Sequence, residues 1–168
     1  MKKAAILMGS ISDLETVRPA FALLEELGIA YEAHVFSAHR TPRQAAAFAR
    51  DASANGFGVL IAAAGKAAHL AGALAAQTAL PIIGIPIKSS TLDGLDALLS
   101  TVQMPQGMPV ATVAIDGAYN AAMLAAQILA VENDNLAQKL AAMREAMTKN
   151  VLQKDAELQT ILARKVTI

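Results

Sequence analysis

The chain has 168 residues, a length that suits one domain with its own hydrophobic core. Apolar residues make up 55% and charged residues 17%, below the roughly 25% typical of soluble domains, so subunit contacts are expected to bury the apolar excess. Lysine plus arginine and aspartate plus glutamate number 14 each, and aromatic residues are only 4%, which argues against a nucleic-acid partner. The absence of cysteine excludes disulfides and thiolate chemistry, and it fits the cytoplasmic location that we expect.

Short apolar runs alternate with helical patterns along the chain. In order, the predicted elements are strands at 4–8, 31–36, 59–64, 82–85 and 110–114, and helices at 13–27, 42–55, 66–77, 92–101 and 118–130. The first helix ends at Gly28, and Pro19 is expected to kink it or shift its start. The apolar region 59–87 is interrupted by Lys66, His69 and two prolines, so no membrane span is expected.

Strands that are apolar throughout, rather than alternating, indicate a sheet covered on both faces. The strand–helix alternation then predicts a parallel, doubly wound sheet with right-handed crossovers. We therefore expect a flavodoxin-like three-layer α/β/α sandwich with strand order 2-1-3-4-5, in a single domain whose core spans 1–131.

The last segment, 132–168, differs from the core. Asn133 is a candidate N-cap, and one apolar stripe follows it on an otherwise polar helix, formed by Leu136, Leu140, Met143, Met147 and Val151. The stripe fits equally a helix folded back on its own domain and a C-terminal arm that packs on a neighbouring subunit.

Polar residues gather after the first three strands, where ligands of open α/β sheets bind. Ser10, Ser12 and Asp13 follow the first strand, at a helix start that attracts anions. No dinucleotide or Walker motif is present, and a carboxylate suits a sugar diol better than a phosphate. On this loop alone, capping of the helix by Ser12 or Asp13 ranks ahead of ligand binding.

The second loop is more informative. Arg40 offers a planar fork for phosphate, and the adjacent His39 can exchange a proton near neutral pH, although a lone histidine is more often structural. His34 lies within the predicted second strand and is assigned a structural role. His69 is expected about one turn into the third helix, behind the residues that contact a ligand. The histidine spacing gives a metal site no support, and none is predicted.

Several motifs in order resemble the class I N5-carboxyaminoimidazole ribonucleotide mutases of purine biosynthesis. They are Gly9-Ser10-Ile11-Ser12-Asp13, Ser37-Ala38-His39-Arg40-Thr41-Pro42, Ala67-Ala68-His69-Leu70, Val102-Gln103-Met104-Pro105, 109–115 and 124–129, and together they cover about 4–130. The resemblance implies an isomerase that moves a carboxyl group from the exocyclic nitrogen to ring carbon C4 of an aminoimidazole ribonucleotide. It implies no cofactor, a small-molecule substrate and a homo-oligomer, since the family forms octamers.

The resemblance also implies roles for individual residues. His39 would shuttle the proton; Ser12, Ser37 and Arg40 would bind the phosphate; Asp13 would bind the ribose; and Ser10 would also contact the substrate. Gly65, Lys66 and His69 belong to a loop that approaches the base and the migrating carboxylate.

That third loop departs from the family pattern, because Ala63 and Lys66 replace glycines and Ala71 replaces a proline. Two interpretations of Lys66 stay open: contact with the substrate carboxylate, or exposure to solvent. A basic residue here also keeps a class II carboxylase, which adds CO2 directly to the ribonucleotide, as an alternative. A flavodoxin-like module that binds FMN or another phosphate ligand without catalysis is the alternative of another class.

Overall fold

The computed structural model describes residues 1–165, with side chains through residue 163, so the last residues of the expected arm, 166–168, lie outside the described residues. Strands β1 to β5 span Lys3–Met8, Tyr31–Val35, Phe57–Gly65, Ile82–Ile87 and Ala111–Thr112. Helices α1 to α6 span Leu14–Leu27, Pro42–Asp51, Leu70–Ala75, Leu95–Val102, Ala118–Ala130 and Asp134–Lys165, and short 3-10 turns precede α1 and α4. None of the described helices is long and apolar enough to cross a membrane.

The strands form one parallel sheet in the order β2-β1-β3-β4-β5, which confirms the predicted topology. The central strands β1, β3 and β4 are buried almost throughout, as expected of a sheet covered on both faces. Edge strand β2 is largely exposed. Edge strand β5 is shorter than predicted, because only Ala111 and Thr112 pair with β4.

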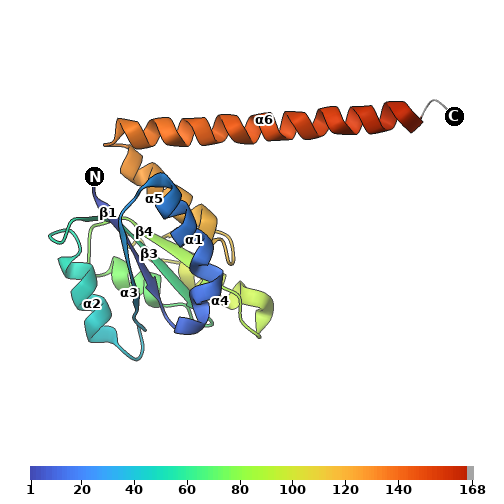
Figure 1. The fold of residues 1–168 in the computed structure, drawn as a ribbon. Helices are drawn as coiled ribbons and strands as arrows, with labels where there is room; N and C mark the ends of the chain where they lie inside the picture. Colours follow the sequence, from blue (N-terminus) through green and yellow to red (C-terminus); the bar gives the residue numbers. More distant parts are fainter. Residues whose placement is uncertain (166–168) are drawn as a thin grey trace.

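Helices cover the two faces of the sheet separately (Figure 1). On one face, α1 and α5 bury a cluster that includes Ile6, Ile61 and Ile83. On the other face, α2 and α3 bury Leu7 and Leu60. Helix α4 also packs on β4, where a Cβ on Gly84 would lie 2.3 Å from the Thr101 methyl group, so glycine permits this close approach. The result is the predicted three-layer sandwich.

Helix α3 is much shorter than the sequence suggested. It begins at Leu70 rather than Lys66, because Lys66 adopts a left-handed φ of 56° that an α-helix cannot contain. His69 therefore occupies the N-cap position of α3 and is not one turn into the helix. By contrast, α1 runs through Pro19 without interruption to Leu27, and Gly28 is its C-cap.

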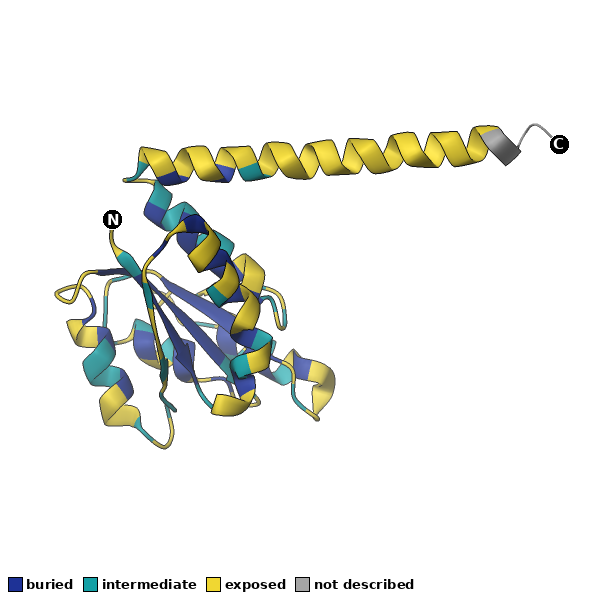
Figure 2. Cartoon of the chain, viewed as in Figure 1, coloured by how far each residue is buried: buried dark blue, intermediate teal, exposed yellow. Residues whose placement is uncertain are grey.

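The C-terminal helix α6 begins as predicted, since Asn133 Oδ1 accepts a hydrogen bond of 2.9 Å from the Leu136 N–H. The first turns of the helix fold back on their own domain, and packing of the remainder on a neighbouring subunit stays a prediction. Leu136 and Leu140 are buried against the domain, whereas residues 151–163 are exposed. Figure 2 shows this exposed part projecting away from the sandwich.

Candidate active site

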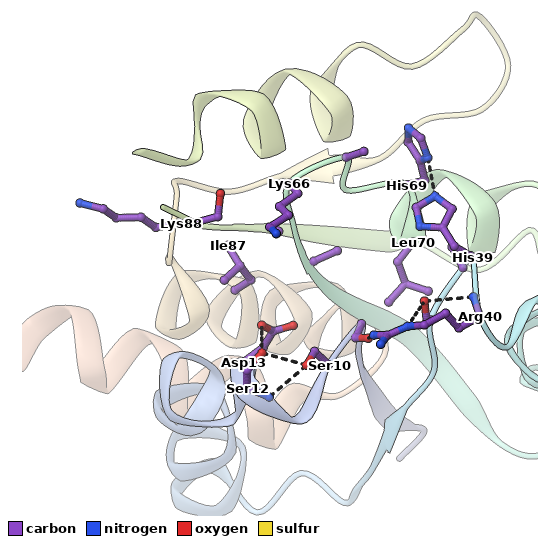
Figure 3. A pocket seen from close by; sticks show the side chains of 17 residues that line it. Ser10, Ser12, Asp13, His39, Arg40, Lys66, His69, Leu70, Ile87 and Lys88 are labelled. Carbon is purple, nitrogen blue, oxygen red and sulfur yellow. Dashed lines mark hydrogen bonds between the residues drawn. The ribbon is translucent and has the colours of Figure 1, made fainter. Parts of the chain in front are cut away.

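A pocket of about 620 Å³ opens at the carboxyl ends of β1 to β4 (Figure 3). Its volume lies within the roughly 300–1,000 Å³ typical of small-molecule sites. The structure brings together there every residue that the sequence analysis assigned to the site: Ser10, Ser12, Asp13, Ser37, His39, Arg40, Gly65, Lys66 and His69. Their individual roles toward a substrate stay predictions.

The loop after β1 forms a network of its own. Ser10 caps the 3-10 turn by accepting a 3.3 Å hydrogen bond from the Ser12 N–H. The Ser12 hydroxyl lies 2.8 Å from Ser10 Oγ and 3.3 Å from Asp13 Oδ1, and it can donate to only one of them at a time. Asp13 occupies the N-cap of α1 but its carboxylate makes no capping bond, so the expected capping by Ser12 or Asp13 is wrong.

Asp13 is buried although it lines the pocket. Burial raises the pKa of its carboxyl above the ordinary value, and the nearby carboxylate of Asp116 adds to the rise, while hydrogen bonds from Ser12 and Ser10 oppose it. Such a carboxylate is short of hydrogen-bond donors for its charged form. It is therefore suited to accept hydrogen bonds from hydroxyl groups of a ligand.

The loop after β2 is closed by Thr41, whose Oγ1 accepts a 2.8 Å bond from the Ser37 N–H. This turn brings the Arg40 N–H to 3.2 Å from Ser37 Oγ. The Arg40 guanidinium donates to the Gly9 carbonyl at 3.2 Å, which ties the loops after β1 and β2 together. Hydroxyls and a guanidinium thus share one side of the pocket, an arrangement suited to a phosphate group.

His39 and His69 meet although 30 residues separate them. His39 Nε2 lies 2.7 Å from His69 Nδ1, and the rings are nearly perpendicular, at 77°. One proton must lie between the two nitrogens, so one ring donates while the other accepts. This contact occupies Nε2 of His39 and leaves Nδ1 as the nitrogen that can exchange a proton with a ligand. His34, by contrast, stacks on Phe36 and does not line the pocket, in agreement with a structural role.

The third and fourth strands supply the remaining wall. Gly65 lies beside β4, where a Cβ would come within 3.1 Å of the Ile87 carbonyl oxygen. Ala63 is fully buried in the sheet and is absent from the pocket lining, unlike its neighbour Gly65. The carboxyl end of β4 also lines the pocket, through residues that include Lys88 and Ser89, and the sequence analysis did not identify them. A search for polar residues directly after the fourth strand, as was done for the first three, would have identified this segment.

The pocket therefore combines a cationic and hydroxyl-rich side, a buried carboxylate and a histidine pair. Among residues 1–165, no three histidine, aspartate or glutamate side chains gather in a way that could hold a metal ion. Anion binding, sugar recognition and proton transfer are the chemistry that these side chains can perform.

Comparison with known proteins identifies the family of this chain. Residues 3–150 match the family described as AIRC, AIR carboxylase. The chain is 50% identical over 161 residues to the N5-carboxyaminoimidazole ribonucleotide mutase of Thermotoga maritima, covering 96% of this chain and 94% of that protein. It is 53% identical over 152 residues to the mutase of the same name from Saccharolobus solfataricus, covering 90% and 96%.

A solved structure agrees with these likenesses. The crystal structure of Treponema denticola PurE superposes with a TM-score of 0.84 at 28% identity, covering 92% of this chain and 97% of that one. The family match and the two relatives extend over nearly the whole described fold, including all four pocket-forming strands. The chain therefore belongs to the AIR carboxylase family.

Proposed function

We propose that this protein is an N5-carboxyaminoimidazole ribonucleotide mutase, which converts N5-carboxyaminoimidazole ribonucleotide to 4-carboxyaminoimidazole ribonucleotide in purine biosynthesis. Relatives that carry this name are about half identical to the chain over nearly its full length. The structural observation that carries the proposal is the His39–His69 pair beside a hydroxyl- and guanidinium-lined pocket.

The substrate has a phosphate and a ribose that must be recognised before any chemistry. Ser12, Ser37 and Arg40 are proposed to bind the phosphate, because their donors line one side of the pocket. Asp13 is proposed to accept hydrogen bonds from the ribose hydroxyls, which would supply the donors that its buried carboxylate lacks. Ser10 completes this set from the same loop.

The reaction moves CO2 between two positions of one molecule, so atoms balance without a co-reactant. The N–CO2 bond breaks as His39 donates a proton to the exocyclic nitrogen, which leaves aminoimidazole ribonucleotide and CO2 in the pocket. Ring carbon C4 then attacks CO2, and His39 accepts the proton that C4 loses. One histidine serves both steps because it is restored to its starting state after the second.

His69 is proposed as a positioning residue for His39. Its Nδ1 lies within hydrogen-bond distance of His39 Nε2, so it orients the ring and selects the nitrogen that carries the proton. It reaches His39 from the N-cap of α3, on a different loop.

The remaining proposals concern assembly and location. We infer a homo-oligomer, specifically an octamer, in which the arm 132–168 contributes contacts, because the exposed apolar side chains of α6 have no cover within the described residues. The core 1–131 and the arm are treated as one domain. A cytoplasmic location accompanies this function, because a charged ribonucleotide substrate does not cross membranes unaided.

The function is tested by supplying the purified protein with each candidate substrate. We expect rapid formation of 4-carboxyaminoimidazole ribonucleotide from the N5-carboxylated ribonucleotide without added CO2. Turnover of only aminoimidazole ribonucleotide plus CO2 would identify a class II carboxylase instead. A yellow protein with bound FMN and no turnover of either substrate would identify a binding module.

A further inference from the structure

Lys66 has an unusual backbone conformation for its residue type. Its φ of 56° lies in the left-handed region, which costs a residue with a Cβ about 1–2 kcal/mol relative to the ordinary helical conformation. The side chain is exposed, so packing does not compensate this cost. Strained residues of this kind concentrate at ligand-binding sites, where the side chain is held in position for use.

The Lys66 side chain points into the pocket from the loop that also carries His69, on the side opposite Asp13 (Figure 3). No salt bridge or side-chain hydrogen bond of Lys66 occurs among the described residues, and no ion pair joins it to Asp13. The ammonium group therefore faces the cavity without an ion-pair partner among the described residues.

The other two cations of the pocket are already engaged. The Arg40 guanidinium bonds to the Gly9 carbonyl and approaches Ser37 Oγ, on the proposed phosphate side. Lys88 Nζ forms a 3.0 Å ion pair with Asp93, and its side chain points away from the cavity (Figure 3). Lys66 thus stands apart as the pocket cation that a second anion of a ligand could reach.

We propose that Lys66 binds the carboxylate that migrates during the reaction. This inference rests on the proposed function, whose substrate carries two anionic groups, a phosphate and a carboxylate. With the phosphate assigned to Ser12, Ser37 and Arg40, the carboxylate near the histidine pair needs a cationic partner, and Lys66 lies on the loop of His69.

The chemistry gives this ion pair a distinctive kinetic signature. The carboxylate is charged in the substrate and in the product but becomes neutral CO2 between them. Lys66 therefore stabilises the two bound end states more than the intermediate, so it strengthens binding without accelerating decarboxylation. Loss of its charge is expected to raise KM while kcat stays unchanged or rises.

The test uses Lys66→Met, which removes the charge but keeps a Cβ and a side chain of similar length. Affinities are measured by calorimetry for 4-carboxyaminoimidazole ribonucleotide and for aminoimidazole ribonucleotide, which lacks the carboxylate. We expect Lys66→Met to weaken binding of the carboxylated ligand about tenfold, as for one partly exposed charged contact, and to leave the other affinity within twofold. Lys66→Arg, which keeps a cation, should retain most of the discrimination.

Two controls separate this effect from others. Lys2→Met removes an exposed cation at the opposite end of the sheet, outside the pocket lining, and should change neither affinity by more than twofold. Lys66→Gly removes both the charge and the left-handed strain, so it should reproduce the loss of discrimination in a fully stable protein. Equal affinities of the Lys66→Met and wild-type proteins for the carboxylated ligand would overturn the lysine proposal alone. A wild-type protein that binds neither ribonucleotide would overturn the proposed function together with it.

Discussion

The two ends of the sheet differ in the contacts that their side chains make. At the carboxyl ends of the strands, the loops after β1 and β2 are joined by hydrogen bonds such as that of Arg40 to the Gly9 carbonyl. At the opposite end, α6 leaves the domain beside the N-terminus and carries apolar side chains into solvent (Figure 1). The first end is organised by contacts within one chain, whereas the second leaves apolar side chains exposed.

This difference teaches where to expect chemistry and where to expect assembly. A polar pocket whose groups already hold one another needs little rearrangement to bind a ligand. An apolar helix face that buries only its first residues, Leu136 and Leu140, exposes the rest, which is the surface where we propose that subunits assemble. The following changes test this division, beginning with the largest expected effect.

Replacement of the proposed proton carrier should affect the pocket end most. We expect His39→Asn to lower kcat by about 10²- to 10⁴-fold, because general acid–base catalysis contributes on that order, with substrate affinity changed only a few-fold. Steady-state kinetics and calorimetry together measure the two effects. His34→Asn is the matched control, since His34 lies outside the pocket lining, and a comparable loss of kcat there would remove the special role of His39.

Loss of the guanidinium should weaken binding rather than chemistry. We expect Arg40→Met to raise KM about 10- to 100-fold, the range of one hydrogen-bonded charge contact to phosphate, with a smaller change in kcat. Arg43→Met removes a neighbouring arginine that does not line the pocket, and it should leave KM within twofold. An unchanged KM for Arg40→Met would show that the phosphate binds elsewhere.

Neutralising the buried carboxylate of Asp13 should weaken substrate binding but stabilise the fold. Asp13→Asn should raise KM about five- to tenfold through weaker hydrogen bonds to the ribose. It should also raise the melting temperature at neutral pH. Because burial raises the pKa of Asp13, ionisation costs the folded state more than the unfolded state.

The sign of this effect gives a pH test. Below the ordinary aspartate pKa, the carboxyl is protonated in both states and the penalty is absent. As the pH rises through the elevated folded-state pKa, the penalty develops and the wild-type protein loses stability relative to Asp13→Asn. The difference in melting temperature should therefore be larger at about pH 8 than at about pH 4, and a constant difference would contradict a burial penalty at Asp13.

The smallest effect on the core is expected from shortening α6. A chain that ends after Ala146 keeps the buried Leu136 and Leu140, whereas removal of the whole arm from Asn133 would strip them from the domain. We expect the shorter chain to retain its circular dichroism spectrum but to show a lower mass by light scattering. A double change, Val151→Lys with Leu158→Lys, should have the same effect with the helix intact. A full-length protein that is monomeric would contradict the assembly proposed for this end.

Much of the fold could be predicted because local patterns and packing agree. Fully apolar runs indicated buried strands, and the structure buries β1, β3 and β4 on both faces. The prediction that the third helix begins at Lys66 was wrong. The alanine-rich sequence favours a helix there, but the left-handed conformation of Lys66 prevents it. The predicted fifth strand was too long. Its apolar residues lie at the edge of the sheet, where only two of them pair with β4.

The candidate site was predicted less completely than the fold. The sequence indicated His39 and Arg40 by their place after a strand, but it assigned His69 to the interior of a helix. The end of β4 was missed, although it carries Lys88 and Ser89. Proximity between loops depends on strand register and turn conformation, neither of which a single loop sequence specifies.

The sequence by itself determined which residues are apolar in runs, where turns interrupt them, and hence the strand order and the polar end of the sheet. Only the tertiary structure decided that His39 Nε2 meets His69 Nδ1, that Lys66 turns its ammonium into the pocket, and that α6 departs from the core after its first turns. The physical reason is that periodicity is a local property of the chain. A distance between side chains from different strands instead results from the sum of the packing contacts that fix those strands against one another.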